Sequence, residues 1–178
     1  MYKRQVYVNE EEFDMHYPWM KRRWNYKTCY ETMSLLPDPM VPWTAKWGFW
    51  MSHAINMRGH FIPNDGYAEL RKLVEGRDHF VYTSNGDGMF ERAHFDPERI
   101  YTPQGDYANY QCMGRHLDGP CSRDSVWPLI PLVNDTVHLI DVETGELPPE
   151  RVPTCPVCGG HTFPNLRGGP WCVLGFRV

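Results

Sequence analysis

The sequence predicts an α/β fold, namely part of a Rossmann-like parallel sheet into which a small zinc-binding module is inserted. Two observations favour this class. A helical segment, a two-residue turn and an apolar run follow one another over residues 64–85, which is half of a β-α-β unit. A Cys-Pro-Val-Cys pair at 155–158, with two cysteines upstream, is typical of a metal site. The 178 residues suffice for one domain with such an insertion.

The amino-terminal third is predicted to be helical. Residues 10–36 form helical pieces that Pro18 interrupts, and glutamates precede the first apolar side chains, where the helix dipole favours acidic groups. A longer helix begins at Pro42 and ends at Gly59. Its apolar residues recur at intervals of three and four, and we interpret the tryptophans among them as core residues: Trp43, Trp47, Trp50, Ala54 and Met57.

The most regular helix is predicted for residues 64–75. Asn64 or Asp65 is suited to cap its start, and Gly76 is suited to end it. Its apolar stripe consists of Tyr67, Leu70, Leu73 and Val74. The run at 79–85 is then predicted as a buried parallel strand, because apolar and β-branched residues are continuous in it. Ligands in such sheets bind beyond the strands' carboxyl ends, where residues 83–87 would lie.

Further along the chain, residues 98–102 and 107–112 are predicted as short strands. Residues 113–154 are rich in Pro, Gly and Asp, contain one apolar alternation at 136–142, and are interpreted as an insertion rather than as part of the sheet. The predicted organisation is therefore a partial Rossmann-like domain of residues 1–111 and 160–178, with its helical amino-terminal segment, and a zinc-binding module of residues 112–159.

Composition excludes several classes of partner. The formal net charge is −4 and the charges are scattered, so there is no basic surface for nucleic acid. Neither an apolar stretch of about 18 residues nor an amino-terminal signal region is present, so we expect no membrane association and a cytoplasmic location.

The six cysteines of such a chain point to metal binding or free thiols rather than to disulfides. Cys155 and Cys158 form a zinc-knuckle turn with glycine directly after the second cysteine. The other two ligands are predicted to be Cys112 and Cys121, although His116 could replace one of them. The alternative is a redox pair at 155–158, but redox pairs normally open a helix, whereas this one follows Pro153 and precedes two glycines. We interpret Cys29 and Cys172 as buried or free thiols.

Several motifs now stand in a recognisable order: Thr83-Ser84-Asn85-Gly86-Asp87, then ERAHFDPERIY, Gln104-Gly105-Asp106, the two cysteine pairs, and FPNLRGG. Over residues 60–169 this order resembles the sirtuin family of NAD-dependent enzymes. Gln104 stands where that family has its catalytic histidine, and Gly86 replaces a branched apolar residue. The Gln-Gly-Asp-Tyr and Asn-Leu-Arg segments are similar to those of the macrodomain-linked, class M sirtuins, which act as protein ADP-ribosyltransferases.

The resemblance implies roles for particular residues. Asn85 would be the catalytic asparagine that contacts the ribose, Asp87 would help to hold the nicotinamide amide, and the strand around 165–166 would bind the substrate peptide. The implied catalytic pair is Asn85 and Gln104, and the implied NAD-binding residues are Thr83, Ser84, Asn85, Asp87 and Gln104. The implied ligands of a structural zinc ion are Cys112, Cys121, Cys155 and Cys158. The implied partners are a protein substrate of the lipoylated-carrier type and a macrodomain hydrolase.

Residue chemistry leads to the same function. Breaking the nicotinamide–ribose bond requires an oriented amide and charge stabilisation, which Asn85 and Asp87 can provide. Deacylation also requires a base, and Gln104 cannot accept a proton. We therefore predict NAD-dependent protein ADP-ribosylation with release of nicotinamide. The alternatives are a protein deacylase and a catalytically inactive, zinc-stabilised fragment or binding module.

A GAGxS loop, which the family uses to bind NAD, is not found before residue 10. Dinucleotide sites depend on such glycine-rich loops. We therefore expect the chain to be a fragment with an incomplete sheet, and residues 1–178 alone to bind NAD weakly or not at all.

Overall fold

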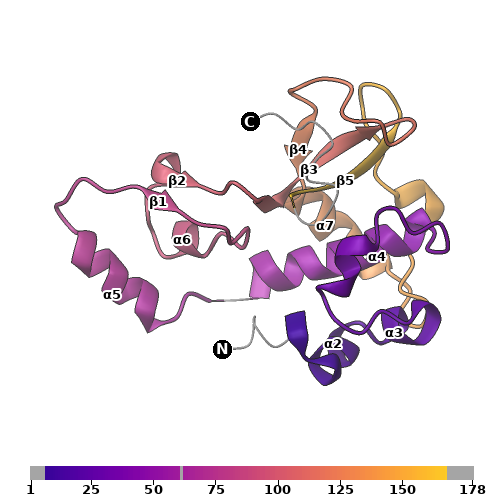
Figure 1. The fold of residues 1–178 in the computed structure, drawn as a ribbon, viewed down its shortest axis with the longest axis horizontal. Helices are drawn as coiled ribbons and strands as arrows, with labels where there is room; N and C mark the ends of the chain where they lie inside the picture. Colours follow the sequence, from indigo (N-terminus) through magenta and orange to yellow (C-terminus); the bar gives the residue numbers. More distant parts are fainter. Residues whose placement is uncertain (1–6, 61, 168–178) are drawn as a thin grey trace.

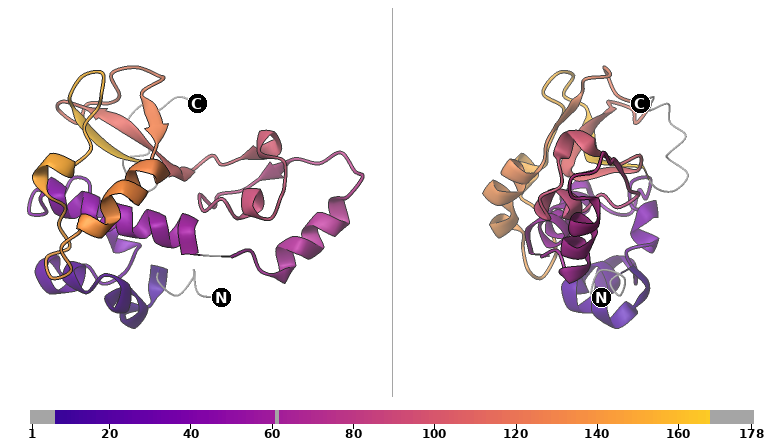
Figure 2. Two further views of the ribbon diagram at one scale, coloured as in Figure 1. Left: turned by 180° about the vertical axis from the view of Figure 1, so that it is seen from behind. Right: turned by 90° about the vertical axis from the view of Figure 1, so that its left-hand side faces the viewer.

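The computed structural model of the chain describes residues 7–60 and 62–167, and it has two parts (Figure 1). The larger part packs a three-stranded antiparallel sheet and helix α7 against the amino-terminal helices. The smaller part extends sideways from it and contains a two-stranded parallel sheet and two helices. Figure 2 shows the same separation from behind. Between residues 7 and 167, apart from 61, no helix is long and apolar enough to cross a bilayer.

The amino-terminal helices follow the predicted pattern. Helix α2 (Glu10–His16) begins after Asn9, whose Oδ1 accepts hydrogen bonds from the backbone N–H groups of Glu11 and Glu12. Pro18 opens helix α3 (Pro18–Trp24), where a missing N–H costs nothing, so the interruption predicted at this proline is confirmed. A 3₁₀ turn, η1 (Glu31–Ser34), completes the segment.

Helix α4 (Trp43–Ala54) is the centre of the core. Nine of its residues are buried, and Trp47 and Trp50 are only 1% and 2% exposed, which confirms their predicted packing role. The predicted helix continues past Ala54, but as a π-helical segment, η2 (Ile55–His60). Gly48 allows a loop to approach closely, because a Cβ there would lie 1.9 Å from the carbonyl oxygen of Gly145.

The antiparallel sheet has the order β4–β3–β5, with β4 at Val126–Pro128, β3 at Gly105–Gly114 and β5 at His161–Leu166. The strand predicted at 107–112 is therefore confirmed, but it belongs to this sheet and not to the parallel one. Strand β3 runs through the predicted boundary at residue 112, because its hydrogen bonds to β5 continue as far as Gly114.

The apolar alternation at 136–142 does not form a strand. It includes the last residue of helix α7 (Ile130–Thr136) and a 3₁₀ turn, η4 (Val137–Leu139). Leu129, Val133 and Leu147 are buried in the same hydrophobic cluster as α4. The alternation of apolar residues at 136–142 is typical of a strand, but here the segment is helical and its apolar side chains pack beside α4. A further 3₁₀ turn, η5 (Pro149–Arg151), precedes the cysteine knuckle.

The smaller part contains helix α5 (Asp65–Val74), strand β1 (Val81–Tyr82), helix α6 (Met89–Arg92), the turn η3 (Pro97–Arg99) and strand β2 (Ile100–Tyr101). Asn64 caps α5 through its Oδ1, as predicted, and Gly76 follows the helix with a φ of 69°. Strands β1 and β2 pair in parallel, which confirms the predicted orientation. Two strands do not establish a Rossmann fold.

The predicted burial of this parallel unit is wrong for the described residues. Tyr82 is 71% exposed, Phe80 is 60% exposed, and α5 has no buried residue at all. A run of apolar residues is buried only where another layer covers it, and in residues 7–60 and 62–167 no layer covers the outer face of this unit.

Candidate functional site

The four predicted metal ligands come together at the far end of the antiparallel sheet. Ligand atoms of Cys112, Cys121, Cys155 and Cys158 all lie within 4.8 Å of one another. Cys112 Sγ lies 3.6 Å from Cys158 Sγ, and Cys121 Sγ lies 3.7 Å from Cys155 Sγ. Metal–sulfur bonds of about 2.3 Å in a tetrahedral site place sulfurs about 3.8 Å apart, whereas a disulfide holds them at about 2.05 Å. The cluster therefore has the dimensions of a metal site, and His116 is not part of it.

Backbone N–H groups point at the sulfurs, as thiolates require. Gly114 N lies 3.2 Å from Cys112 Sγ, and Gly160 N lies 3.3 Å from Cys158 Sγ. Burial raises the pKa of the Cys155 thiol, but hydrogen bonds from the N–H groups of Cys158 and Val157 and from the side chains of Cys158 and Cys112 together lower that pKa to about 7. Burial raises the pKa of Cys112 to about 12, so metal binding there would release a proton.

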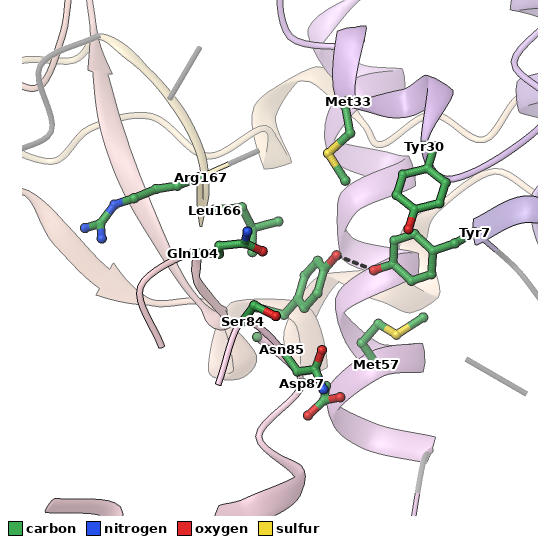
Figure 3. Close-up of a pocket in the computed structure, with 12 residues that line it drawn as sticks. Tyr7, Tyr30, Met33, Met57, Ser84, Asn85, Asp87, Gln104, Leu166 and Arg167 are labelled. Carbon is green, nitrogen blue, oxygen red and sulfur yellow. Dashed lines mark hydrogen bonds between the residues drawn. The ribbon is translucent and has the colours of Figure 1, made fainter. Parts of the chain in front are cut away.

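A pocket of about 420 Å³ lies where the two parts of the molecule meet. Its wall on one side comes from the loop after β1 and from the start of β3. On the other side it comes from the amino-terminal segment and from η2 (Figure 3). It is lined by Tyr7, Tyr30, Met33, Met57, Ser84, Asn85, Gly86, Asp87, Gln104, Tyr107, Leu166 and Arg167.

The pocket brings together four of the five predicted NAD-binding residues. Ser84, Asn85 and Asp87 follow β1, and Gln104 precedes β3, twenty residues later in the sequence. Thr83 does not line the pocket. Its Oγ1 accepts a hydrogen bond from Asn85 N at 3.1 Å, so Thr83 shapes the turn that presents Asn85.

Asn85 and Gln104 are both exposed, and their side-chain amides are available to a ligand. Asp87 is different, since it is only 7% exposed and its Oδ1 accepts a hydrogen bond from Met89 N at 2.9 Å. Asp87 therefore also supports the start of α6.

Two glycines explain the close approach of the pocket segments. A Cβ on Gly86 would lie 2.9 Å from the carbonyl oxygen of Gly105, and Gly86 itself accepts a hydrogen bond from Tyr107 N at 3.0 Å. Gly105 has a φ of 84°, and a Cβ there would lie 1.9 Å from the carbonyl oxygen of Asn165. Glycine after Gln104 is thus required by the contact between β3 and β5. Glycine at 86 is required by the contact between the loop after β1 and the start of β3.

Arg58 fastens the smaller part to β3. Its guanidinium bonds Asp106 at 2.8 Å and Glu91 at 3.0 Å, and its side chain is only 11% exposed. Burial raises the pKa of Asp106, and the charge of Arg58 opposes that rise. Gly88 has a φ of 64° and leaves space for Arg58, because a Cβ at 88 would lie 1.3 Å from Nη1. Together, the two ion pairs of Arg58 hold the loop with Asn85 beside the start of β3 with Gln104, on the same wall of the pocket.

Sequence reasoning missed the aromatic wall of the pocket. Tyr7 and Tyr107 are hydrogen-bonded through their hydroxyl oxygens at 2.7 Å, drawn as a dashed line in Figure 3. Behind them lies His53, which is 1% exposed and whose pKa burial lowers to about 3. The only sequence signal was Tyr107 itself, directly after the Gln-Gly-Asp motif.

No protein-family model matches the chain. Two curated proteins do. A probable bifunctional ADP-ribose hydrolase/ADP-ribosyltransferase of Fusarium oxysporum f. sp. cubense is 35% identical over 129 residues, which are 71% of this chain and 21% of that protein. A protein ADP-ribosyltransferase of Staphylococcus aureus strain Mu50 is 25% identical over 165 residues, which are 91% of this chain and 48% of that protein.

Both relatives are named as ADP-ribosyltransferases. The chain spans about a fifth of the length of the first relative and about half of the second.

Proposed function

We propose that the protein is an NAD-dependent, sirtuin-type ADP-ribosyltransferase that breaks the nicotinamide–ribose bond and transfers ADP-ribose to a protein. The observation that carries the proposal is the meeting of Asn85, Asp87 and Gln104 in one pocket. The names of the two relatives support the same reaction class.

The proposed roles follow from the chemistry of these side chains. The Asn85 amide is exposed at the pocket and would orient the ribose, while Asp87 would accept a hydrogen bond from the nicotinamide amide. Positive charge develops on the ribose as nicotinamide leaves, and fixed dipoles aimed at that charge lower the barrier. The Gln104 amide would hold a ribose hydroxyl, since it both donates and accepts hydrogen bonds.

Deacylation is the less well supported function for this pocket. It requires a base that accepts a proton from a ribose hydroxyl, and histidine serves because its usual pKa is about 6.5. The described lining contains no histidine. His53 lies behind the tyrosines, and with a pKa of about 3 it accepts no proton near neutral pH.

Zinc is the proposed metal of the cysteine cluster, because four thiolates at tetrahedral spacing suit this ion and leave no open position for catalysis. Its role would be structural. A lipoylated carrier protein is the proposed substrate type, and a macrodomain hydrolase the proposed partner. The hydrolase activity in the name of the Fusarium relative supports that pairing.

The experiment uses the full-length protein with NAD labelled in its adenine, a lipoylated carrier protein and an acetyl-lysine peptide. We expect labelled protein, one nicotinamide released for each ADP-ribose transferred, and little deacylated peptide. Asn85→Ala and Gln104→Ala should abolish labelling, whereas Asn134→Ala, an exposed asparagine of α7 outside the pocket, should not. Efficient deacylation without protein labelling would refute the proposal.

A further inference from the structure

A chain of hydrogen bonds runs from the core to the pocket wall. Asn56 Nδ2 donates to Tyr17 Oη at 3.1 Å, and Tyr17 Oη lies 2.9 Å from His53 Nδ1. On the other side of the ring, His53 Nε2 lies 3.2 Å from Tyr107 Oη and 3.3 Å from Tyr7 Oη. The last link is the 2.7 Å contact between the two phenols at the pocket.

The donors and acceptors of this hydrogen-bond network fix the positions of its protons. Tyr17 is 1% exposed, so its hydroxyl hydrogen needs a buried acceptor, because an unmade buried hydrogen bond is costly. His53 Nδ1 lies 2.9 Å from that hydroxyl and can accept its hydrogen, whereas Asn56 Nδ2 can only donate to it. Cys29 Sγ also lies 3.9 Å from His53 Nδ1, and as a thiol it too would donate to that nitrogen. A neutral imidazole has one acceptor and one donor, so Nε2 of His53 must carry the hydrogen.

The hydrogen on His53 Nε2 also decides the direction of the hydrogen bonds at the pocket. His53 Nε2–H donates to Tyr107, the nearer phenol, and Tyr107 donates its own hydrogen to Tyr7. With Nε2 a donor and Tyr107 already donating, the described network leaves no acceptor for the Tyr7 hydroxyl hydrogen. Tyr7 lines the pocket and is only half-buried, whereas Tyr107 is 6% exposed.

We propose that His53 is a positioning residue that acts through Tyr107 and Tyr7, and that it fixes the Tyr7 hydroxyl as an uncharged hydrogen-bond donor to an oxygen of the ligand in the pocket. The inference rests on the proposed function for the identity of that ligand, NAD, whose ribose hydroxyl and carboxamide oxygens are suitable acceptors. Being uncharged, the donor is present at every pH at which the protein is folded.

The first test needs no activity. Long-range ¹H–¹⁵N spectra of the full-length protein report the tautomer of each histidine, and the signal that is absent from His53→Gln belongs to His53. We expect the Nε2–H tautomer, unchanged between pH 5.5 and 8. A proton on Nδ1, or titration of His53 in that range, would overturn the proposal even if NAD binds as proposed.

The second test is a double-mutant cycle on NAD binding and nicotinamide release. Tyr7→Phe removes the donor and should weaken NAD binding by about 3- to 10-fold, the value of one uncharged hydrogen bond. His53→Leu should cause a similar loss, and it should cause no further loss in a Tyr7→Phe background. Tyr107→Phe, which breaks the link while keeping the ring, replaces His53→Leu if that variant does not fold.

His53→Gln keeps an N–H group near the place of Nε2 and should restore most of the binding. Independent, additive losses from His53→Leu and Tyr7→Phe would show a merely structural histidine and would overturn the proposal. If the parent protein bound no NAD, the proposed function would fail, while the tautomer would still decide whether His53 orders the tyrosines.

Discussion

Gly105→Ala tests how the sequence positions Gln104. Gly105 has a φ of 84°, and its absent Cβ would lie 1.9 Å from the Asn165 carbonyl oxygen. Left-handed backbone costs a residue other than glycine about 1–2 kcal/mol, and forcing apart packed strands costs about 1–3 kcal/mol more. We therefore expect Gly105→Ala to destabilise the fold by about 2–5 kcal/mol, which lowers Tm by about 4–20 °C for a chain of this length.

Gly76→Ala is the matched control. Gly76 has a φ of 69°, and a Cβ there would meet nothing within 4 Å. It should therefore show the backbone cost alone, about 1–2 kcal/mol or about 2–8 °C in Tm. The difference in Tm between the two variants, measured by calorimetry, separates the cost of the left-handed backbone from the cost of the steric overlap between β3 and β5. Equal losses for the two substitutions would refute the argument that the approach of β3 to β5 requires glycine.

The same substitution should affect the pocket. The Gln104 carbonyl oxygen accepts a hydrogen bond from Arg167 N at 2.8 Å, and the register of the two strands aligns Gly105 with Leu166, which lines the pocket. A side chain at 105 would push β3 away from β5 and displace Gln104. Nicotinamide release should therefore fall in Gly105→Ala and remain at the parental level in Gly76→Ala.

Three further predictions follow from the metal cluster, the pocket and the core. Chelation of the proposed zinc ion, or Cys158→Ser, should unfold the β3–β5 end of the sheet. Elemental analysis finding much less than one zinc per chain would contradict this. Asn85→Ala should slow nicotinamide release by roughly a hundredfold with Tm unchanged, and a parental rate would make Asn85 structural. The pKa of His53 is about 3 in the folded protein and about 6.5 in the unfolded chain. Between these two pH values the unfolded chain binds a proton at His53 and the folded protein does not. His53 should therefore lower the free energy of unfolding by about 1.4 kcal/mol for each pH unit below 6.5. The fall should be less steep in His53→Gln, and parallel pH profiles of Tm for the parent and this variant would contradict the prediction.

Local sequence patterns predicted the local structure well. The break at Pro18, the apolar stripe of α4 and the Asn64 cap depend on residues within one or two helical turns, and all three are confirmed. The motif order singled out Asn85 and Gln104, and the structure brings both of them to one pocket; their roles there stay a prediction.

Contacts between distant segments could not be predicted in this way. Tyr7 and Tyr107 are 100 residues apart, and His53 and Tyr107 are 54 residues apart, so no periodicity connects them. Burial was the other failure. Phe80 and Tyr82 form an apolar run, but their exposure depends on which layer covers β1, and the run itself carries no information about that layer.

Strand β3 connects the cysteine cluster with the pocket. It begins at Gly105, beside Gln104, and carries Cys112 and Gly114 near its other end, roughly 20–25 Å away at the usual rise per residue. Strand β5 runs in the opposite direction, from His161, directly after the cysteine knuckle, to Leu166 at the pocket. The cysteine cluster therefore ties together two strands whose opposite ends form the wall that carries Gln104. If the proposed zinc ion is bound there, its loss should loosen that wall and lower nicotinamide release, even though no cysteine among the described residues lines the pocket.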